Sequence, residues 1–372
     1  MHGMDRRTFT GIAAATVASV VAAPSAAQAA TSSARSAGRP GRRPGSPLVV
    51  GHRGASGYRP EHTLASYTLA AHLGADFIEP DLVITKDGVL VCRHEPEISG
   101  TTDVAQHPEF ASRRTTKSLD GVATTGWFVE DFTLAELRTL RAVERLPELR
   151  QHNTVYNGLW QIPTFEEVLQ LRKELSRDLG REIGVYPETK HPTYFRAMGL
   201  PLEERLVPLV RKHGLDRAKA PIFIQSFELK NLQDLRHRLG VKAPLVFLTS
   251  AKGGPFGDGR TYAELLTRSG MATYAQDIDG LGPDQSQVIS RKADGSTGTV
   301  TTLVADAHAN GLSVCPYTVR AENANLPTDY RTGTNPADFG RVLAYFAALY
   351  ATGIDGIFSD MPDLAVLARD LD

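Results

Sequence analysis

The sequence predicts an α/β protein built on a parallel barrel or sheet, and three short apolar runs near its start favour this fold. Each run leads into side chains that can do chemistry. These are His52-Arg53 after Leu48–Gly51, Glu79-Pro80-Asp81 after the next run, and Arg93-His94 after Val89–Cys92. Parallel strands gather their carboxyl ends on one face, so we expect the active site there.

The first 47 residues are interpreted as export and linker segments. Asp5-Arg6-Arg7-Thr8-Phe9 precedes the apolar run Ile12–Ala23, and Ala27-Gln28-Ala29 offers a cleavage site. These features predict a twin-arginine signal peptide over residues 1–29, hence an exported protein that is secreted, periplasmic or cell-wall associated. The run is shorter than the roughly 20 residues that span a bilayer, so no stable membrane insertion is expected. Residues 30–47 predict a disordered linker.

Composition and charge narrow the class of function. The chain is 41% hydrophobic and 22% charged, which is typical of a globular protein with a sizeable core. Its formal net charge of −1 gives no electrostatic case for nucleic acid or an anionic membrane as a partner. Cys92 and Cys315 lie in apolar runs and are expected to be buried thiols, although an exported protein could pair them.

Helices and strands alternate along the chain. Thr63–Leu73 predicts a helix closed by Gly74, and it leads into a strand at Asp76–Leu82. Only a turn fits between Asp81 and Val89, so one βα unit is irregular. Further strands are predicted at Ile183–Tyr186, Ile222–Gln225, Leu245–Leu248, Val314–Val319 and Gly356–Ser359.

Capping signals mark two further helices. Thr164-Phe165-Glu166-Glu167 is a capping box that opens a helix to about Leu179. Asn335-Pro336 predicts the start of another helix, which Gly353 ends. Counting Thr273–Ile278 gives nine candidate strands, one more than a closed barrel of eight needs, so one of them is expected to lie outside.

The domain spanning residues 48–372 is longer than the roughly 250 residues of a plain eight-stranded barrel. The excess falls at about residues 96–162, a polar stretch with one helical segment at Leu134–Val143. A structureless loop of that length would be unusual. We therefore expect a small inserted subdomain over the mouth of the barrel, after the third strand.

Three carboxylates at predicted strand ends are candidate metal ligands. Glu79 and Asp81 are two residues apart on one strand and would share a face, and Glu188 follows another strand of the same sheet. Without Cys or His between them, this oxygen-only set suits a hard divalent cation, Ca²⁺ or Mg²⁺, rather than Zn²⁺. The alternative is three surface or salt-bridged acids.

Two histidines and two cations follow the same strands. His52 and His94 end strands that we expect to be neighbours, and they could be an acid–base pair because imidazole titrates near neutral pH. A structural role is the alternative, but the three acids beside them favour catalysis. Arg53 and Lys190 would bring positive charge for a phosphate oxyanion, unless they pair with the acids.

Short motifs occur in order from residue 48 to residue 362. They are His52-Arg53-Gly54-Ala55-Ser56-Gly57, Pro60-Glu61-His62-Thr63, Glu79-Pro80-Asp81-Leu82-Val83-Ile84-Thr85-Lys86-Asp87-Gly88, Arg93-His94, Pro187-Glu188-Thr189-Lys190, Gln225-Ser226-Phe227-Glu228, Pro316-Tyr317-Thr318-Val319 and Asp355-Gly356-Ile357-Phe358-Ser359-Asp360. Together they resemble the glycerophosphodiester phosphodiesterase family. His62 stands where much of the wider family has Asn, so the chain is most similar to the exported bacterial branch.

The resemblance implies a (β/α)8 TIM-type barrel with a helical insertion after the third strand. It also implies the roles of the site residues. His52 and His94 would be the acid–base pair, and Glu79, Asp81 and Glu188 would bind one divalent cation, with Ca²⁺ favoured and Mg²⁺ the alternative. Arg53 and Lys190 would bind the phosphate. The glycerol side of the pocket would be lined by Glu61, Phe227 and Tyr317. Glu95 departs from the family, which usually has Asp there, and this puts any supporting contact from that position in doubt.

The expected activity is metal-dependent hydrolysis of small-molecule glycerophosphodiesters, the deacylated phospholipids, to sn-glycerol 3-phosphate and an alcohol by histidine acid–base catalysis. One alternative is a related phosphodiesterase acting on intact lipids or wall glycerol-phosphate polymers. Another is a catalytically inactive binding protein, against which the presence of both histidines and all three carboxylates argues. The head group, the roles of the two histidines, the oligomeric state and any protein partners stay open.

Overall fold

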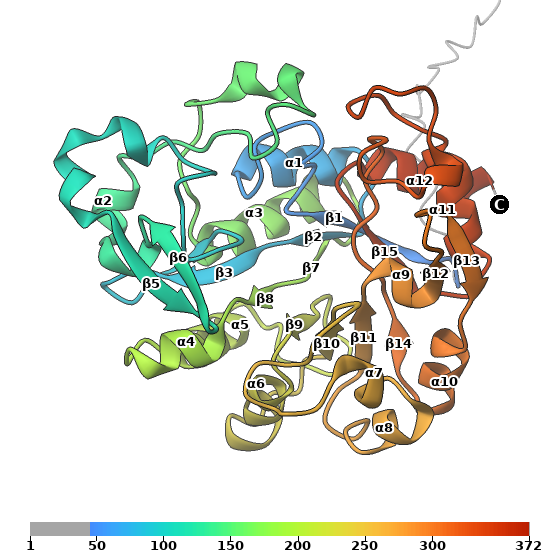
Figure 1. The fold of residues 1–372 in the computed structure, drawn as a ribbon. Coiled ribbons are helices and arrows are strands. Elements are labelled where there is room, and N and C mark those ends of the chain that lie inside the picture. The colour runs from blue at the N-terminus through green and yellow to red at the C-terminus, as the bar shows by residue number, and fades with distance from the viewer. Residues whose placement is uncertain (1–44, 372) are drawn as a thin grey trace, which may run out of the picture. The chain divides into compact units, whose positions relative to one another are not determined.

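The computed structural model describes residues 45–371, in which helices and short strands alternate along the chain (Figure 1). The predicted signal peptide and most of the predicted linker lie outside these residues. Among the helices of this part of the chain, none has the length and hydrophobicity that crossing a bilayer requires.

Eight parallel strand positions close into a barrel. In order they are β1 (Leu48–His52), β2 with β3 (Phe77–Glu79, Asp81–Ile84), β7 with β8 (Gly184–Val185, Glu188–Thr189), β9 (Ile224–Ser226), β10 (Leu245–Thr249), β11 (Gly280–Pro283), β14 (Ser313–Val314) and β15 (Gly356–Ser359). Asp355 N donates to Val314 O at 2.8 Å, and Phe358 N donates to Pro316 O at 3.0 Å. These bonds join β15 to the β14 segment and close the ring, so the predicted α/β barrel is confirmed.

A proline interrupts two of the barrel strands. Pro80 separates β2 from β3, and Pro187 separates β7 from β8. Because proline has no N–H to donate, the hydrogen-bond ladder breaks at both positions. The strand predicted at Asp76–Leu82 is therefore split in two, and the one predicted at Ile183–Tyr186 is β7, with β8 continuing beyond the break.

One predicted strand is wrong, and the structure identifies the candidate that lies outside the barrel. Thr273–Ile278 is not a strand but the turn that follows helix α8 (Arg268–Ala272). The strand at this place is β11, whose sequence Gly-Leu-Gly-Pro has low β propensity. The candidate outside the barrel is β4 (Leu90–Cys92), which pairs antiparallel with β3 across the predicted turn. The prediction that His52 and His94 end neighbouring strands is therefore wrong, because β1 pairs with β2 whereas β4 pairs with β3.

Helices surround the strands (Figure 1). Helix α1 (Leu64–His72) begins at Thr63, whose Oγ1 accepts from Ser66 N at 3.1 Å, and α3 (Phe165–Asp178) begins with the predicted capping box. The start predicted at Asn335-Pro336 is wrong, since α11 (Val342–Tyr350) begins later and Asn335 lies in a turn. The other helices are α4 (Pro192–Ala197), α5 (Glu203–Lys212), α6 (Leu229–Gln233), α7 (Tyr262–Leu265), α9 (Gln285–Val288), α10 (Leu303–Ala309) and α12 (Pro362–Leu371).

Residues 96–162 lie between β4 and α3 and consist of one hairpin, short helices and turns. Their main element is the antiparallel hairpin of β5 (Thr115–Leu119) and β6 (Val122–Gly126). The helix predicted at Leu134–Val143 is only the single turn α2 (Leu134–Leu137). Four 3-10 helices lie beside α2 in this stretch, at Val104–Gln106, Pro108–Arg113, Val129–Asp131 and Gln151–Tyr156. The helical segments of the insertion are therefore short, mostly 3-10 turns. A second hairpin, β12 (Ile289–Arg291) with β13 (Thr297–Val300), follows β11.

Two groups of buried apolar side chains form the core. The smaller group fills the barrel and comprises Val50, Phe77, Tyr186, Val246, Cys315 and Phe358. The larger group packs between the strands and the helices and extends into residues 96–162. Cys92 belongs to the larger group, and both cysteines are buried and free, as expected for thiols in apolar strands.

The turn after β1 packs directly on α1, and glycine is needed there. Gly54 has φ +89°, and a Cβ on it would lie 2.6 Å from the carbonyl carbon of Ser66. Gly121, at the tip of the β5–β6 hairpin, has φ +85° but no atom within 4 Å of such a Cβ. Alanine at either position is strained by roughly 1–2 kcal/mol.

We predict that Gly54→Ala lowers the free energy of unfolding by at least about 1 kcal/mol more than Gly121→Ala, because only Gly54 also meets backbone. Urea titration of both variants measures the difference. Equal losses would contradict the close packing of this turn on α1.

Candidate active site

Three buried carboxylates meet where the prolines interrupt the barrel strands. One oxygen from each of Glu79, Asp81 and Glu188 lies within 4.8 Å of the other two. Glu79 ends β2 beside His52, and Asp81 begins β3 in register with Glu188 on β8. Within residues 45–371 this is the one such group of potential ligands. The structure thus brings the three predicted ligands together, though they come from split strands.

The electrostatics of this group fit a divalent cation. Burial, together with the charges of Asp81 and Glu188, raises the pKa of Glu79 well above its ordinary value. Burial and the charge of Asp81 likewise raise the pKa of Glu188 to about 8. Asp81 Oδ1 is buried and has no hydrogen-bond partner. A bound cation would offset the repulsion and use the unpaired oxygen, so these residues suit a divalent metal site.

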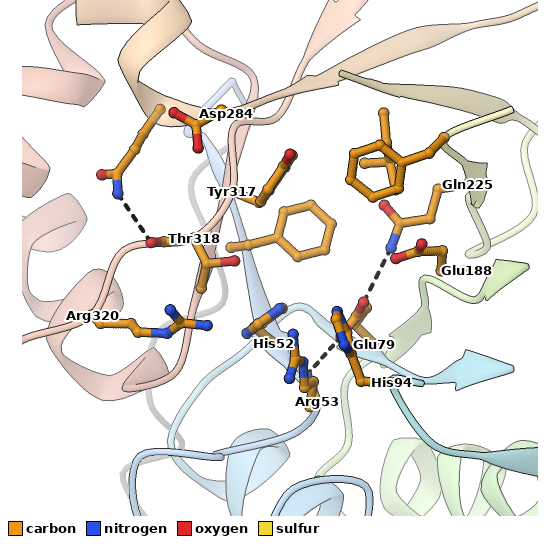
Figure 2. Close-up of a pocket in the computed structure, with 14 residues that line it drawn as sticks. His52, Arg53, Glu79, His94, Glu188, Gln225, Asp284, Tyr317, Thr318 and Arg320 are labelled. Atoms are coloured by element: carbon orange, nitrogen blue, oxygen red, sulfur yellow. Dashed lines mark hydrogen bonds between the residues drawn. The ribbon is translucent and has the colours of Figure 1, made fainter. Parts of the chain in front are cut away.

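Neighbouring groups orient Glu79. Its Oε2 accepts from Arg53 N at 2.7 Å, and its Oε1 accepts from Gln225 Nε2 at 3.2 Å (Figure 2). Arg53 has a positive φ of 57°, and this turn directs its N–H at the carboxylate. Gln225 was part of a sequence motif but had no predicted role, and the structure places it in the site.

His52 is held by a carboxylate from the other end of the chain. Its Nδ1 lies 2.6 Å from Asp360 Oδ1, while Asp360 Oδ2 accepts from Arg150 Nη2 at 2.6 Å and from Arg320 Nε at 2.8 Å. Burial and the charge of Arg53 lower the pKa of His52 to about 4, so the ring is neutral. With the Nδ1 proton directed at Asp360, Nε2 is the atom free to act as a base.

His94 has a similar arrangement on a different segment. Its Nδ1 contacts the carboxylate of Glu95, and its Nε2 lies 3.3 Å from Lys190 Nζ. Burial and the charges of Arg53 and Lys190 lower the pKa of His94 to about 3. The longer side chain of Glu95 thus still supplies a supporting contact. Arg145 holds Glu95 in turn, donating to Oε2 at 2.6 Å.

The two predicted phosphate-binding cations both pair with acids. Arg53 Nη1 donates to Glu61 Oε2 at 2.9 Å, and Lys190 Nζ lies 2.8 Å from Glu188 Oε1. Both side chains are buried beside the carboxylate group. In this structure the two cations balance the charges of Glu61 and Glu188. Both also lie close enough to the three carboxylates to contact a phosphate group bound there.

A polar cavity of about 200 Å³ opens on this face of the barrel (Figure 2). It is lined by His52, Arg53, Glu79, His94, Glu188, Gln225, Phe227, Leu248, Asp284, Gln285, Tyr317, Thr318, Arg320 and Phe358. Phe227 and Tyr317 lie there as predicted, with ring centroids 5.8 Å apart.

Glu61 is placed differently from the prediction and does not line this cavity. Arg53 and Arg145 hold its carboxylate, with Arg145 donating from Nε and Nη2 at 2.7 Å each. Its partner Arg145 lies in residues 96–162, where no sequence pattern pointed to a contact with Glu61.

The fold and this site define a barrel enzyme directed at phosphate esters. Three carboxylates suited to a divalent metal ion lie beside the Arg53 and Lys190 side chains, which can bind phosphate oxygens. Two neutral imidazole rings beside them can accept and donate protons.

The family model described as the glycerophosphoryl diester phosphodiesterase family matches residues 52–364. Glycerophosphodiester phosphodiesterase GDPD6 of Arabidopsis thaliana is 36% identical over 327 residues, which cover 84% of this chain and 83% of that protein. The glycerophosphodiester phosphodiesterase of Haemophilus influenzae is 30% identical, over 86% of this chain and 88% of the relative. The chain belongs to the glycerophosphoryl diester phosphodiesterase family, as its motifs predicted.

Solved structures support the fold. A glycerophosphodiester phosphodiesterase from Agrobacterium tumefaciens matches with a TM-score of 0.53 and 20% identity, over 86% of this chain and 99% of that one. An Oleispira antarctica phosphodiesterase, solved in complex with the product sn-glycerol-3-phosphate, matches with a TM-score of 0.56 and 22% identity, over 87% and 97% of the two chains. Both are similar to this chain across the whole barrel.

We predict that Ca²⁺ raises the melting temperature of the wild-type protein, because a ligand of the folded state stabilises it. Glu79→Gln removes a ligand and one of the repelling charges, so this variant should stay folded yet lose most of the rise. Glu148→Gln, an exposed acid in residues 96–162, is the control. A Glu79→Gln variant that keeps the full rise in thermal unfolding would exclude Glu79 as a ligand.

Proposed function

We propose that this chain hydrolyses glycerophosphodiesters to sn-glycerol 3-phosphate and an alcohol, with one divalent cation held by Glu79, Asp81 and Glu188. The observation that carries the proposal is the buried carboxylate group with two neutral histidines beside it, in a chain of this family. The product named for the Oleispira antarctica relative supports it. The oxygen-only ligands favour Ca²⁺, with Mg²⁺ as the alternative.

Arg53 and Lys190 would bind the phosphate. A cation held by the three carboxylates would polarise the phosphoryl group and balance its developing charge. Glu188 then no longer needs its partner, so Lys190 Nζ, 2.8 Å away, can turn to a phosphate oxygen. Arg53 stays paired with Glu61 through Nη1, and its Nε, which has no hydrogen-bond partner and lies 3.6 Å from Asp81 Oδ2, is free to donate to the phosphate. Lys190 would thus pair with Glu188 in the absence of substrate and with the phosphate in its presence.

The two histidines would move the protons. One imidazole takes the proton from the attacking hydroxyl, and the other donates a proton to the leaving alcohol. Asp360 and Glu95 each face the Nδ1 atom of one ring, so each can stabilise the imidazolium that forms. A second step that opens a cyclic product with water would exchange these roles.

We propose also that the chain is exported by the twin-arginine pathway, on the evidence of the leader sequence alone. Replacing Arg6 and Arg7 together by lysine should leave the protein, expressed in a bacterium that has the pathway, inside the cell. Cell fractionation and immunoblotting measure this, and normal export of the double variant would contradict the proposal.

We predict that His52→Ala and His94→Ala each lower kcat by at least about a hundredfold, the low end for a positioned acid or base. His107→Ala is the control, because His107 contacts Glu109 on the surface of residues 96–162. Steady-state rates should be read beside melting temperatures. A variant with a near-normal rate and unchanged stability would remove that histidine from the mechanism.

The nucleophile can be identified with a substrate analogue. If the glycerol hydroxyl at carbon 2 attacks its own phosphate, the step gains from proximity, with effective molarities of about 10⁵ M or more in well-oriented cases. The 2-deoxy analogue should then bind but release its alcohol orders of magnitude more slowly. Rapid hydrolysis of this analogue would rule out the cyclic route while leaving the phosphodiesterase activity intact.

A further inference from the structure

A second cavity of about 400 Å³ adjoins the first and has no part in the mechanism above. The two cavities share His94, Glu188 and Phe227 in their walls. Because His94 and Glu188 would face the scissile phosphate, a diester bound there places its two organic groups in the two cavities. The first offers hydrogen-bonding groups that suit the hydroxyls of glycerol, so the second is left for the alcohol.

The second cavity contains a buried carboxylate without a cationic partner. Glu228, 4% exposed, precedes α6, and its oxygens accept from the N–H and the hydroxyl of Thr193. Among the described residues, no Lys, Arg or His forms an ion pair with it. Burial, with the charges of Asp120 and Glu203, raises the pKa of Glu228 to about 7, as expected for a carboxylate that lacks a countercharge.

A second acid reaches the same cavity from the hairpin in residues 96–162. Asp120 lies in the turn between β5 and β6, and its Oδ2 is 2.5 Å from Nδ1 of His191. Its Oδ1 is buried without a hydrogen-bond partner. Lys190 and His191 also line this cavity, where Lys190 pairs with Glu188 and His191 pairs with Asp120. Among the acids that line this cavity, Glu228 is therefore the one that no Lys, Arg or His of the described residues pairs with.

Aromatic rings complete the wall. Phe227, Tyr262 and Phe256 line the cavity, and Phe256 is 44% exposed. The Lys190 ammonium already lies 5.6 Å from the Phe227 ring centroid, which shows that a cation is accommodated against this ring. Aromatic faces together with carboxylates are the groups that bind ammonium and quaternary ammonium ions.

We propose that the second cavity binds the alcohol part of the substrate and selects alcohols that carry an ammonium group, such as choline and ethanolamine. This selection rests on the proposed glycerophosphodiester hydrolysis. Glu228 supplies the countercharge, and Asp120, whose Oδ1 has no hydrogen-bond partner, adds a second acceptor. The three aromatic side chains contact the apolar surface of the ammonium group. The inserted hairpin thus contributes to substrate choice through Asp120.

Competing substrates test the selection. We expect the ratio of kcat/KM for glycerophosphocholine to that for glycerophosphoglycerol to fall roughly tenfold or more in Glu228→Gln, as for the loss of one charged contact. Asp120→Asn should lower the ratio in the same direction, and the exposed Glu148→Gln should leave it unchanged. A ratio that Glu228→Gln and Asp120→Asn both leave unchanged would overturn the proposal.

A binding measurement that needs no catalysis distinguishes the proposed ammonium site from the proposed hydrolytic activity. Choline should bind the Ca²⁺-loaded protein more tightly than its uncharged isostere, in which a tert-butyl group replaces the trimethylammonium group, and Glu228→Gln should remove the difference. Calorimetric titration measures both. Wild-type protein that binds choline selectively but hydrolyses neither substrate would refute the hydrolytic function and leave this site standing. Equal binding of the two compounds would refute the site.

Discussion

Three carboxylates buried within 4.8 Å of one another need compensating positive charge, and the mouth of the barrel is built around this constraint. Lys190 pairs with Glu188, and His62 Nε2 lies 2.9 Å from Asp81 Oδ2. Lys190 and His62 hold the pKa of Asp81 well below its ordinary value although burial opposes this. Within the group one carboxylate is kept ionised while two have raised pKa values, an arrangement that a divalent cation would complete.

The prolines that interrupt the strands and the inserted residues 96–162 both lie beside groups of this site. Pro80 and Pro187 interrupt the strands beside the three acids, because neither has an N–H to donate, while their carbonyl groups still accept from Glu188 N and Gln225 N. The insertion supplies Arg145 and Arg150, which pair with the carboxylates that orient the two histidines. The barrel therefore positions the ligands, and the added segment positions the groups behind the histidines.

Site residues that directly follow a strand could be predicted from the sequence. Contacts between residues that are far apart in the chain could not. Glu79, Asp81 and Glu188 follow apolar runs, so their convergence was predictable from the parallel sheet. The contact between His52 and Asp360 joins residues 308 positions apart, which no local pattern reveals. The strand β11 was missed because Gly and Pro obscure it, and Arg145 was missed because turns carry no periodic signal.

The account depends on one cation site among the three carboxylates, and a crystal of the protein with Ca²⁺ and sn-glycerol 3-phosphate tests it most directly. We expect a single anomalous peak with Glu79, Asp81 and Glu188 as ligands, and Lys190 moved from Glu188 to a phosphate oxygen. A phosphate bound with no ion at the three carboxylates, or an ion bound elsewhere while the Lys190–Glu188 pair stays intact, would contradict the account.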